Sequence, residues 1–186
     1  MQSSIEAFES LESVSLDEFG ACFSNFRTEA FRFEALPVYD VPEEREYFVN
    51  FERGVNCPAD FNAEWLQLIK DAASRNAHFS RVRFIPNQQL TEYLRFEIDW
   101  GYKRSVVAGE KILILNDKTL DRYSSLVPIL DDFWLFDREE CFIMRYDIVG
   151  RFLGVLRVPK KSIDTYTKLA NALLENAVSL EKGPYF

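Results

Sequence analysis

Residues 79–115 read FSRVRFIPNQQLTEYLRFEIDWGYKRSVVAGEKILIL, and this stretch decides the fold. Its first seven residues are mostly apolar and are followed by Pro86, which predicts a β-strand from Phe79 to Ile85. Its last five residues are also mostly apolar and predict a second strand from Lys111 to Leu115.

The segment between these strands has two interpretations. Leu94, Phe96, Ile98 and Trp100 alternate with polar residues, as in a strand. The whole run from Leu90 onward also fits a long helix that is stopped by a glycine at position 109. We favour the helix, because a strand–helix–strand unit then pairs its two strands in parallel.

Similar patterns predict the remaining elements. Apolar stripes and start signals predict helices over residues 16–26, 41–54 and 62–76, and a closing helix that Ser162 should cap. Strands are predicted over residues 30–36, 133–136, 141–146 and 152–158. Hairpin-like turns separate the last three strands, which therefore form an antiparallel meander. Residues 117–130 are expected to form a loop with a turn of helix.

The fold class that follows is α/β. We expect a single mixed sheet with a strand–helix–strand unit, an antiparallel meander near the C-terminal third and a closing C-terminal helix. Serines and glutamates dominate residues 1–15, which predicts a flexible tail, and residues 16–186 should form one domain. A chain of 186 residues with 47% hydrophobic content is long enough to bury one core.

Composition excludes several partners. The formal net charge is −8, from 30 acidic and 22 basic residues, and no basic run offsets it, so direct nucleic-acid binding is not expected. No stretch approaches the length of a membrane span. Cys22, Cys57 and Cys141 are odd in number and widely spaced, which predicts reduced thiols and a cytoplasmic location.

Motifs for catalysis are missing from the sequence. The one histidine, His78, has no nucleophile elbow to serve and is interpreted as a surface residue. One imidazole and three scattered thiols do not make a zinc site, and no glycine-rich phosphate loop is present. Carboxylates around the meander turns match no known ligand spacing. We therefore predict no metal and no cofactor.

Charged residues set in apolar runs are the candidate site. Arg32 and Glu34 alternate with phenylalanine, and Arg95 and Glu97 flank Phe96. Buried ionised groups must pair, so we expect these charges to converge on one side of the domain and line a polar pocket. An exposed face with weak ion pairs is the alternative. The complete candidate set is Arg32, Glu34, Arg95, Glu97, Trp134, Asp137 and Asp147, with Trp134 proposed as an interface aromatic.

A longer series of residues carries a family resemblance. It includes Phe31-Arg32-Phe33-Glu34 with Tyr39, Val41-Pro42-Glu43-Glu44, Trp65-Leu66, Tyr93-Leu94-Arg95-Phe96-Glu97, Ala108-Gly109-Glu110, Asp132-Phe133-Trp134-Leu135-Phe136-Asp137, Tyr146-Asp147 and Gly150-Arg151-Phe152-Leu153-Gly154. Over roughly residues 16–180 this series resembles an uncharacterised bacterial domain family of unknown function. That family is common in actinobacteria and is often encoded beside helix-turn-helix regulators. A weaker likeness is to half of a phospholipase-D-like fold, but the catalytic His-x-Lys motif of that fold is missing.

Two functions follow as hypotheses. The resemblance implies a non-enzymatic interaction or regulatory module that binds a protein partner, such as a helix-turn-helix regulator encoded nearby. The alternative is a small-molecule-binding domain or an enzyme that uses an Arg/carboxylate pocket. The sequence favours the first, because catalytic motifs are missing and aromatic residues are plentiful.

Overall fold

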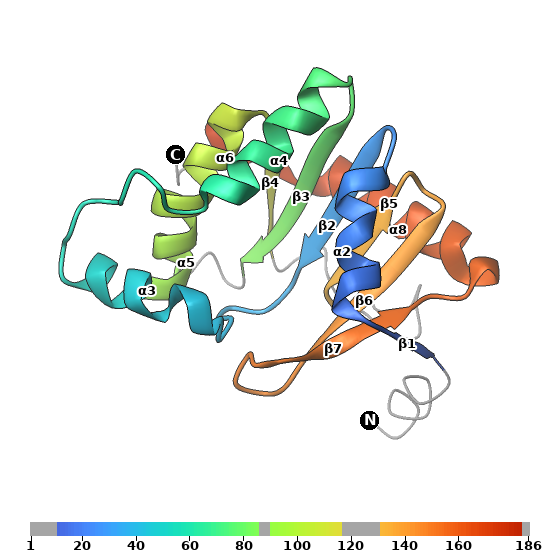
Figure 1. Cartoon of the computed structure of the whole chain (residues 1–186), viewed down its shortest axis with the longest axis horizontal. Helices are drawn as coiled ribbons and strands as arrows, with labels where there is room; N and C mark the ends of the chain where they lie inside the picture. Colours follow the sequence, from blue (N-terminus) through green and yellow to red (C-terminus); the bar gives the residue numbers. More distant parts are fainter. Residues whose placement is uncertain (1–10, 86–89, 117–130, 184–186) are drawn as a thin grey trace.

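The computed structural model describes residues 11–85, 90–116 and 131–183. Its strands form one mixed eight-stranded sheet in the order β1-β7-β6-β5-β2-β3-β4-β8 (Figure 1). Strands β2, β3 and β4 are parallel, and the other pairs are antiparallel. The strand bounds are β1 Glu12–Val14, β2 Glu29–Glu34, β3 His78–Ile85, β4 Lys111–Asn116, β5 Phe133–Phe136, β6 Glu140–Tyr146, β7 Phe152–Arg157 and β8 Val178–Ser179. The α/β fold class predicted from the sequence is confirmed.

The central unit is the strand–helix–strand predicted from residues 79–115. Strands β3 and β4 are parallel neighbours, with Ser80 opposite Lys111 and Ile85 opposite Asn116. Residues 92–108 of the connection are helical and comprise α5 (Glu92–Phe96), the π-helix η3 (Glu97–Tyr102) and α6 (Lys103–Ala108). Gly109 then ends the helix in the left-handed region, at φ 115°.

Helices cover both faces of the sheet and make three layers (Figure 1). On one face, α8 packs its apolar stripe against β2, β3, β4, β5 and β6 through residues that include Phe31, Phe33 and Leu169. On the other face lie α2, α4 and the helical connection, which contribute to two further apolar clusters. The remaining bounds are α2 Leu16–Asn25, η1 Pro42–Glu44, α3 Arg45–Glu52, α4 Ala63–Ser74, η4 Lys160–Ser162, α8 Ile163–Asn176 and η5 Leu180–Lys182.

The meander β5-β6-β7 is also confirmed. Asp137 and Arg138, at φ 53° and 60°, are the two central residues of a tight turn that the Glu139 N–H closes on the carbonyl oxygen of Phe136. The second connection is longer, and its Gly150 packs against the backbone of Val38 and Asp40. A register shift between Arg145 and Tyr146 marks a bulge near the end of β6.

The structure differs from the sequence prediction at two places, near the N-terminus and at the start of the closing helix. Residues 12–14 were predicted to lie in a flexible tail, but they form β1 and pair with β7. Ser162 was predicted to cap the closing helix, but its side chain makes no capping hydrogen bond, because the 3-10 turn η4 leads into α8. The loop predicted for residues 117–130 lies outside the described residues.

Candidate functional site

A row of charged side chains crosses the sheet face opposite α8. Side chains alternate along a strand, so the arginine and glutamate of β2 point away from the phenylalanines that contact α8. The parallel register places Arg32 beside Arg81 and Glu34 beside Arg83. All four residues are buried, and Arg83 is fully enclosed. Ionised groups in this position need partners, because burying an unpaired charge is very costly.

Arg81 is held by two carboxylates. Its Nη1 lies 2.8 Å from Glu34 Oε1, and its Nε lies 2.8 Å from Glu110 Oε1. The guanidinium also lies over the ring of Tyr102, 5.2 Å from the ring centre. Trp65 donates its indole N–H to Glu110 over 3.3 Å, which holds that carboxylate from the other side.

Arg32 and Arg83 each pair with a further carboxylate, and Tyr39 links Arg83 to the carboxylate that pairs with Arg32. Arg32 Nη2 lies 3.1 Å from Asp132 Oδ2, and Arg83 Nη2 lies 2.8 Å from Glu97 Oε2. Tyr39 donates its hydroxyl hydrogen to Asp132 and accepts from Arg83 Nη1 at 3.3 Å. We call this set the charged cluster, and its members are Arg32, Glu34, Arg81, Arg83, Glu97, Glu110 and Asp132.

The π-helix brings Glu97 and Tyr102 onto one side. Residues five apart on an α-helix point in directions about 140° apart, because each residue turns the helix by roughly 100°. Hydrogen bonding from i to i+5 widens the turn and brings such residues back toward the same side of the helix. Tyr102 Oη therefore lies 3.1 Å from Glu97 Oε1. Single π-helical turns are rare and are frequently found at functional sites.

Tyr102 also bridges two carboxylates. Its hydroxyl lies 2.8 Å from Glu34 Oε2 as well as 3.1 Å from Glu97 Oε1. The hydroxyl carries one hydrogen, so it can donate to only one of them. A protonated Glu97 would donate to the Tyr102 oxygen while Tyr102 donates to Glu34. This arrangement satisfies all three groups.

Burial sets the protonation of the carboxylates. Burial raises the pKa of Glu97 to about 7 against the attraction of Arg83, and the charge on Glu34 reinforces the increase. Burial likewise raises the pKa of Asp132 to about 6, although Arg32 opposes it. Glu34 is also buried, but its neighbouring arginines outweigh burial and lower its pKa to about 2. The cluster therefore holds both an ionised carboxylate and one that exchanges a proton near neutral pH.

Two donors of the cluster are left without partners. The Nε atoms of Arg32 and Arg83 are buried and make no hydrogen bond to any described residue. Arg32 Nε lies 3.4 Å from Glu34 Oε1, within ion-pair distance but without hydrogen-bond geometry. A buried donor without a partner costs about 1–3 kcal/mol. The cluster is therefore not arranged for stability alone.

A cavity of about 360 Å³ opens against the cluster. Its floor is the sheet, and its walls come from the start of α4, the helical connection and the segment between β2 and α3. Eight of its seventeen lining residues are aromatic, and the two tryptophan rings among them lie 6.0 Å apart. The lining residues are Arg32, Glu34, Tyr39, Val41, Glu44, Phe61, Asn62, Trp65, Arg81, Tyr93, Phe96, Glu97, Gly101, Tyr102, Ser105, Trp134 and Tyr146.

Four of the seven residues predicted from the sequence meet here. Arg32, Glu34, Glu97 and Trp134 all line the cavity, and the guanidinium of Arg32 lies over the ring of Trp134 at 5.3 Å. Trp134 is therefore a buried cavity wall, with 6% exposure, and not an exposed interface aromatic. The sequence had placed it on an interaction surface.

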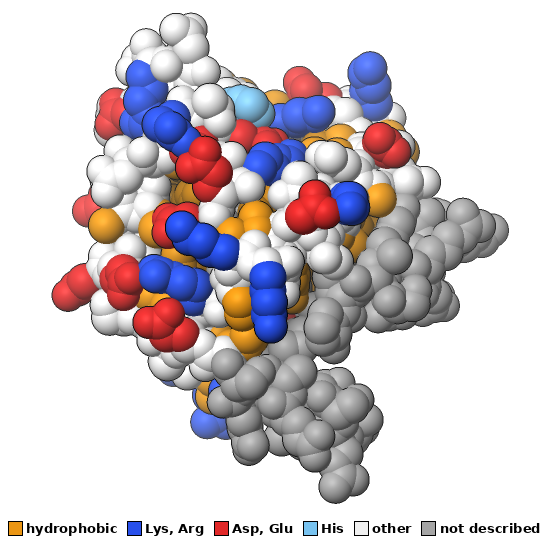
Figure 2. Space-filling view, turned by 90° about the vertical axis from the view of Figure 1, so that its right-hand side faces the viewer, with side chains coloured by type: hydrophobic (Ala, Val, Ile, Leu, Met, Phe, Trp, Pro, Cys, Tyr) orange, Lys and Arg blue, Asp and Glu red, His pale blue; other side chains and the backbone are white. Residues whose placement is uncertain are grey.

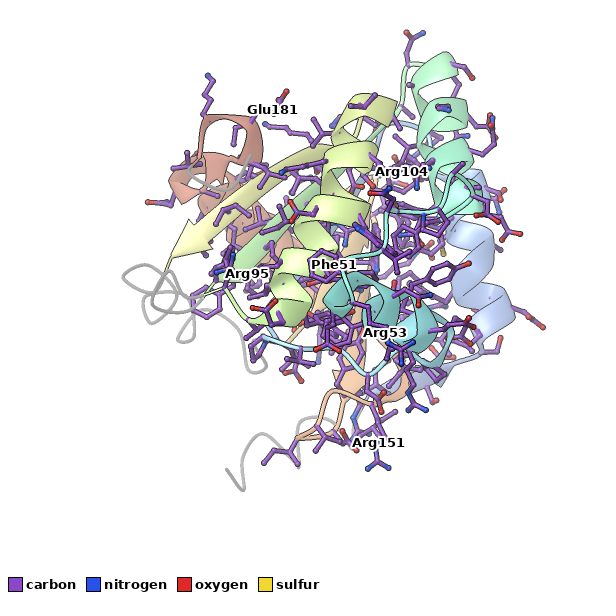
Figure 3. All side chains as sticks on the ribbon, turned by 90° about the vertical axis from the view of Figure 1, so that its left-hand side faces the viewer. Phe51, Arg53, Arg95, Arg104, Arg151 and Glu181 are labelled. Atoms are coloured by element: carbon purple, nitrogen blue, oxygen red, sulfur yellow. The ribbon has the colours of Figure 1, made fainter. Side chains whose placement is uncertain are left out.

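The other three predicted residues lie elsewhere. Arg95 is exposed on the outer side of α5 and pairs with Glu92 (Figure 3). Asp137 accepts backbone N–H groups from the segment before β2, and Asp147 caps its own turn through the amides of residues 149 and 151. The prediction that these three residues converge with the charged cluster is wrong. Charged side chains at strand ends and on outer helix faces turn toward solvent or toward nearby backbone amides.

Four members of the charged cluster were not among the residues predicted from the sequence. Arg81 and Arg83 alternate with apolar residues in β3, the same pattern that drew attention to β2, so this signal could have identified them. Glu110 and Asp132 stand directly before β4 and β5. Their approach to the arginines depends on the strand order, which periodicity does not reveal.

Other candidates for a site are weaker. Within the described residues, no group of three or more His, Cys, Asp or Glu side chains is arranged to hold a metal ion. On the molecular face in Figure 2, acidic and basic side chains are interspersed, without a large patch of one sign. None of the described helices is long and apolar enough to cross a membrane.

Fold and site together define the class of this protein: a three-layer α/β domain with a buried ionic cluster beside an aromatic cavity. The chain belongs to the family described as "Domain of unknown function (DUF6879)", whose family model matches residues 17–182. The resemblance to an uncharacterised family is thus confirmed. No curated protein matches the chain.

Proposed function

We propose that the domain binds a small organic molecule in the cavity against the charged cluster. The observation that carries this proposal is the incompletely paired ionic cluster on a sheet face that is otherwise apolar. A core built for stability would fill this space with apolar side chains, since replacing buried ion pairs in that way is often neutral or stabilising. Polar groups kept at such a cost are typical of functional sites.

The dimensions and chemistry of the cavity support the same proposal. Small-molecule sites range from about 300 to 1,000 Å³ and combine apolar walls with a few fixed polar groups. The cavity of about 360 Å³ has aromatic walls from four elements and carboxyl and guanidinium groups on its floor. A near-neutral pKa beside a tyrosine hydroxyl also allows Glu97 to move a proton.

A variant that fills the cavity tests the proposal. Gly101 lines the cavity, and a Cβ added there meets nothing nearer than the Asn62 amide nitrogen at 3.9 Å. Gly101→Leu should therefore fold and occupy the space. Gly20→Leu is the matched control, because Gly20 lies on α2 with open space around it.

The assay is a fragment screen by ligand-observed NMR, followed by thermal denaturation with each binder. We expect binders that stabilise the wild type and Gly20→Leu but not Gly101→Leu. Equal binding to all three proteins would show that the binding site lies elsewhere on the domain. The proposal would be refuted if no compound in the library bound the wild type and failed to bind Gly101→Leu.

Binding of a protein partner is a second proposed function, and an exposed apolar hairpin supports it. Ile148 and Val149 in the β6–β7 connection, with Phe152 and Leu153 of β7, are all exposed. This hairpin, which carries Arg151, lies far from Arg95 in Figure 3. Such a patch is typical of interaction sites. The partner proposed here is a helix-turn-helix regulator encoded nearby, and the cytoplasm is the proposed location.

Co-purification with the product of the neighbouring gene tests this second function. Leu153→Asp should abolish co-purification, whereas Val107→Asp, an exposed apolar residue on α6, should not. Retention of the partner by Leu153→Asp would exclude the hairpin as its contact.

A further inference from the structure

The cavity and its surroundings hold more carboxylates than guanidinium groups. Five carboxylates face three arginines once Glu44 is added to the charged cluster. Each arginine is already paired with at least one carboxylate of the cluster. The formal excess is therefore two negative charges, in a space where low polarity strengthens electrostatic attraction.

Glu44 and Glu97 are the carboxylates on the helical side of the cavity. Glu44 accepts a hydrogen bond of 3.0 Å from Tyr93 and forms no ion pair with a described residue. Glu97 has Arg83 and the Tyr102 hydroxyl as partners, and its side chain keeps 12% exposure. The other ionised groups that act on Glu97 are Glu34 and Arg81 on the sheet. The described groups around the two glutamates thus leave negative charge uncompensated.

Aromatic rings surround the two glutamates. Tyr93 and Phe96 lie on the same helix as Glu97, and Phe61 faces Phe96 with ring centres 5.5 Å apart. Trp65 and Trp134 complete the far wall. The faces of such rings attract cations. Negative charge and aromatic faces therefore select the same kind of ligand.

We propose that the ligand of this cavity is a small organic cation, an amine with an aromatic body, whose ammonium group is neutralised by Glu44 and Glu97. This inference rests on the proposed small-molecule function and names its ligand class. The aromatic body packs between the rings, and the buried arginines remain with their own carboxylates. A metal ion is disfavoured, because the described carboxylates offer no group of three ligands.

Binding of the amine is coupled to a proton. Burial, reinforced by Glu34 and Glu44, raises the pKa of Glu97, so at pH 6 this carboxyl is mostly protonated and must release its proton to pair with the ammonium group. At pH 8 it is already ionised. An aliphatic amine stays protonated over this range, so the affinity of the domain for such an amine should rise roughly tenfold from pH 6 to pH 8.

Three probes of nearly the same shape test the charge preference: 2-phenylethylamine, 2-phenylethanol and phenylacetate, measured by isothermal titration calorimetry. We expect the amine to bind at least about tenfold more tightly than the alcohol, with phenylacetate weakest. Glu97→Gln and Glu44→Gln should each remove most of this difference. Glu92→Gln, on an exposed face of α5, is the control and should retain it.

The two glutamine variants make the test robust to misfolding. Glu97→Gln removes the charge that faces Arg83 and could lower stability, whereas Glu44 has no such partner, so Glu44→Gln should fold normally. Tighter binding of phenylacetate, or an amine preference unchanged in Glu44→Gln, would overturn the inference. If all three probes bind equally and Gly101→Leu abolishes that binding, the proposed function stands and only the cation inference fails. Without any Gly101-dependent binding, both fail.

Discussion

Glu97 should make the folded domain more stable at mildly acidic pH than at pH 8. Its pKa is about 7 in the folded domain and 4.5 as an ordinary glutamate, so the folded state holds the proton more tightly. A carboxyl with a raised pKa stabilises the fold at low pH, and this contribution is lost as the pH rises through 7. Linkage gives a loss of about 2.5 kcal/mol in the free energy of unfolding between pH 5 and pH 8.

Glu97→Gln removes this titration and leaves the others in place. Urea unfolding of both proteins, followed by tryptophan fluorescence at pH 5 to 8, gives two stability profiles. Their difference isolates Glu97, because Asp132 titrates in both proteins. We expect the wild type to lose about 2.5 kcal/mol relative to Glu97→Gln over this range. Glu92→Gln should follow the wild type, since its side chain is exposed.

The competing view makes Glu97 an ordinary ionised partner of Arg83, 2.8 Å away. In that case attraction would lower its pKa, and its contribution would be lost only below about pH 4.5. The two profiles would then be parallel between pH 5 and pH 8. Parallel profiles would refute our account of the cluster.

Three further substitutions test the packing around the sheet. Gly150→Ala should cost at least about 2 kcal/mol in thermal or urea unfolding, because φ is 85° and the added Cβ would meet the carbonyl oxygen of Val38 at 2.5 Å. Gly20→Ala, inside helix α2 with open space around it, is the control and should instead stabilise the domain by up to about 1 kcal/mol. Asp137→Asn should cost about 1–2 kcal/mol at pH 7, since three backbone amides donate to this carboxylate. These amides, against burial, lower its pKa to about 2, so the cost should vanish as the pH falls from 4 to 2. Trp65→Ala should cost about 2 kcal/mol, less than the 3 to 5 kcal/mol of a fully buried tryptophan, because Trp65 is half-buried at the cavity.

Much of the fold could be predicted because six of the eight strands carry their own signal, whereas the short edge strands β1 and β8 do not. The apolar runs of β3 and β4, and the helical pattern between them, were enough to predict the parallel unit. Ambiguity arose in residues 94–102, where buried side chains occur at every second position. That spacing imitates a strand, but here it arises because the helix is covered on more than one side and contains a π-turn.

The site was only half predictable from local patterns. Arg32 and Glu34 could be found because they alternate with phenylalanine in a strand, and the same reasoning extends to Arg81. Asp132 could not, because its role depends on β5 lying beside β2, a contact across about one hundred residues. Tyr39 lies between elements and has no periodic pattern. Local patterns show that a charge is buried but do not identify its partner.

The π-turn makes the chemistry of this domain depend on residue number as well as residue type. Deletion of one residue between Glu97 and Tyr102 would restore a regular α-helix without removing a single functional group. Tyr102 would then be the fourth residue after Glu97, and the two side chains would still point within about 40° of each other. At the present length, by contrast, a regular α-helix would turn the hydroxyl that joins Glu97 to Glu34 about 140° away from Glu97. Family members of this length therefore need the π-turn to hold the tyrosine over the cavity, whereas members one residue shorter should hold it there on a regular α-helix.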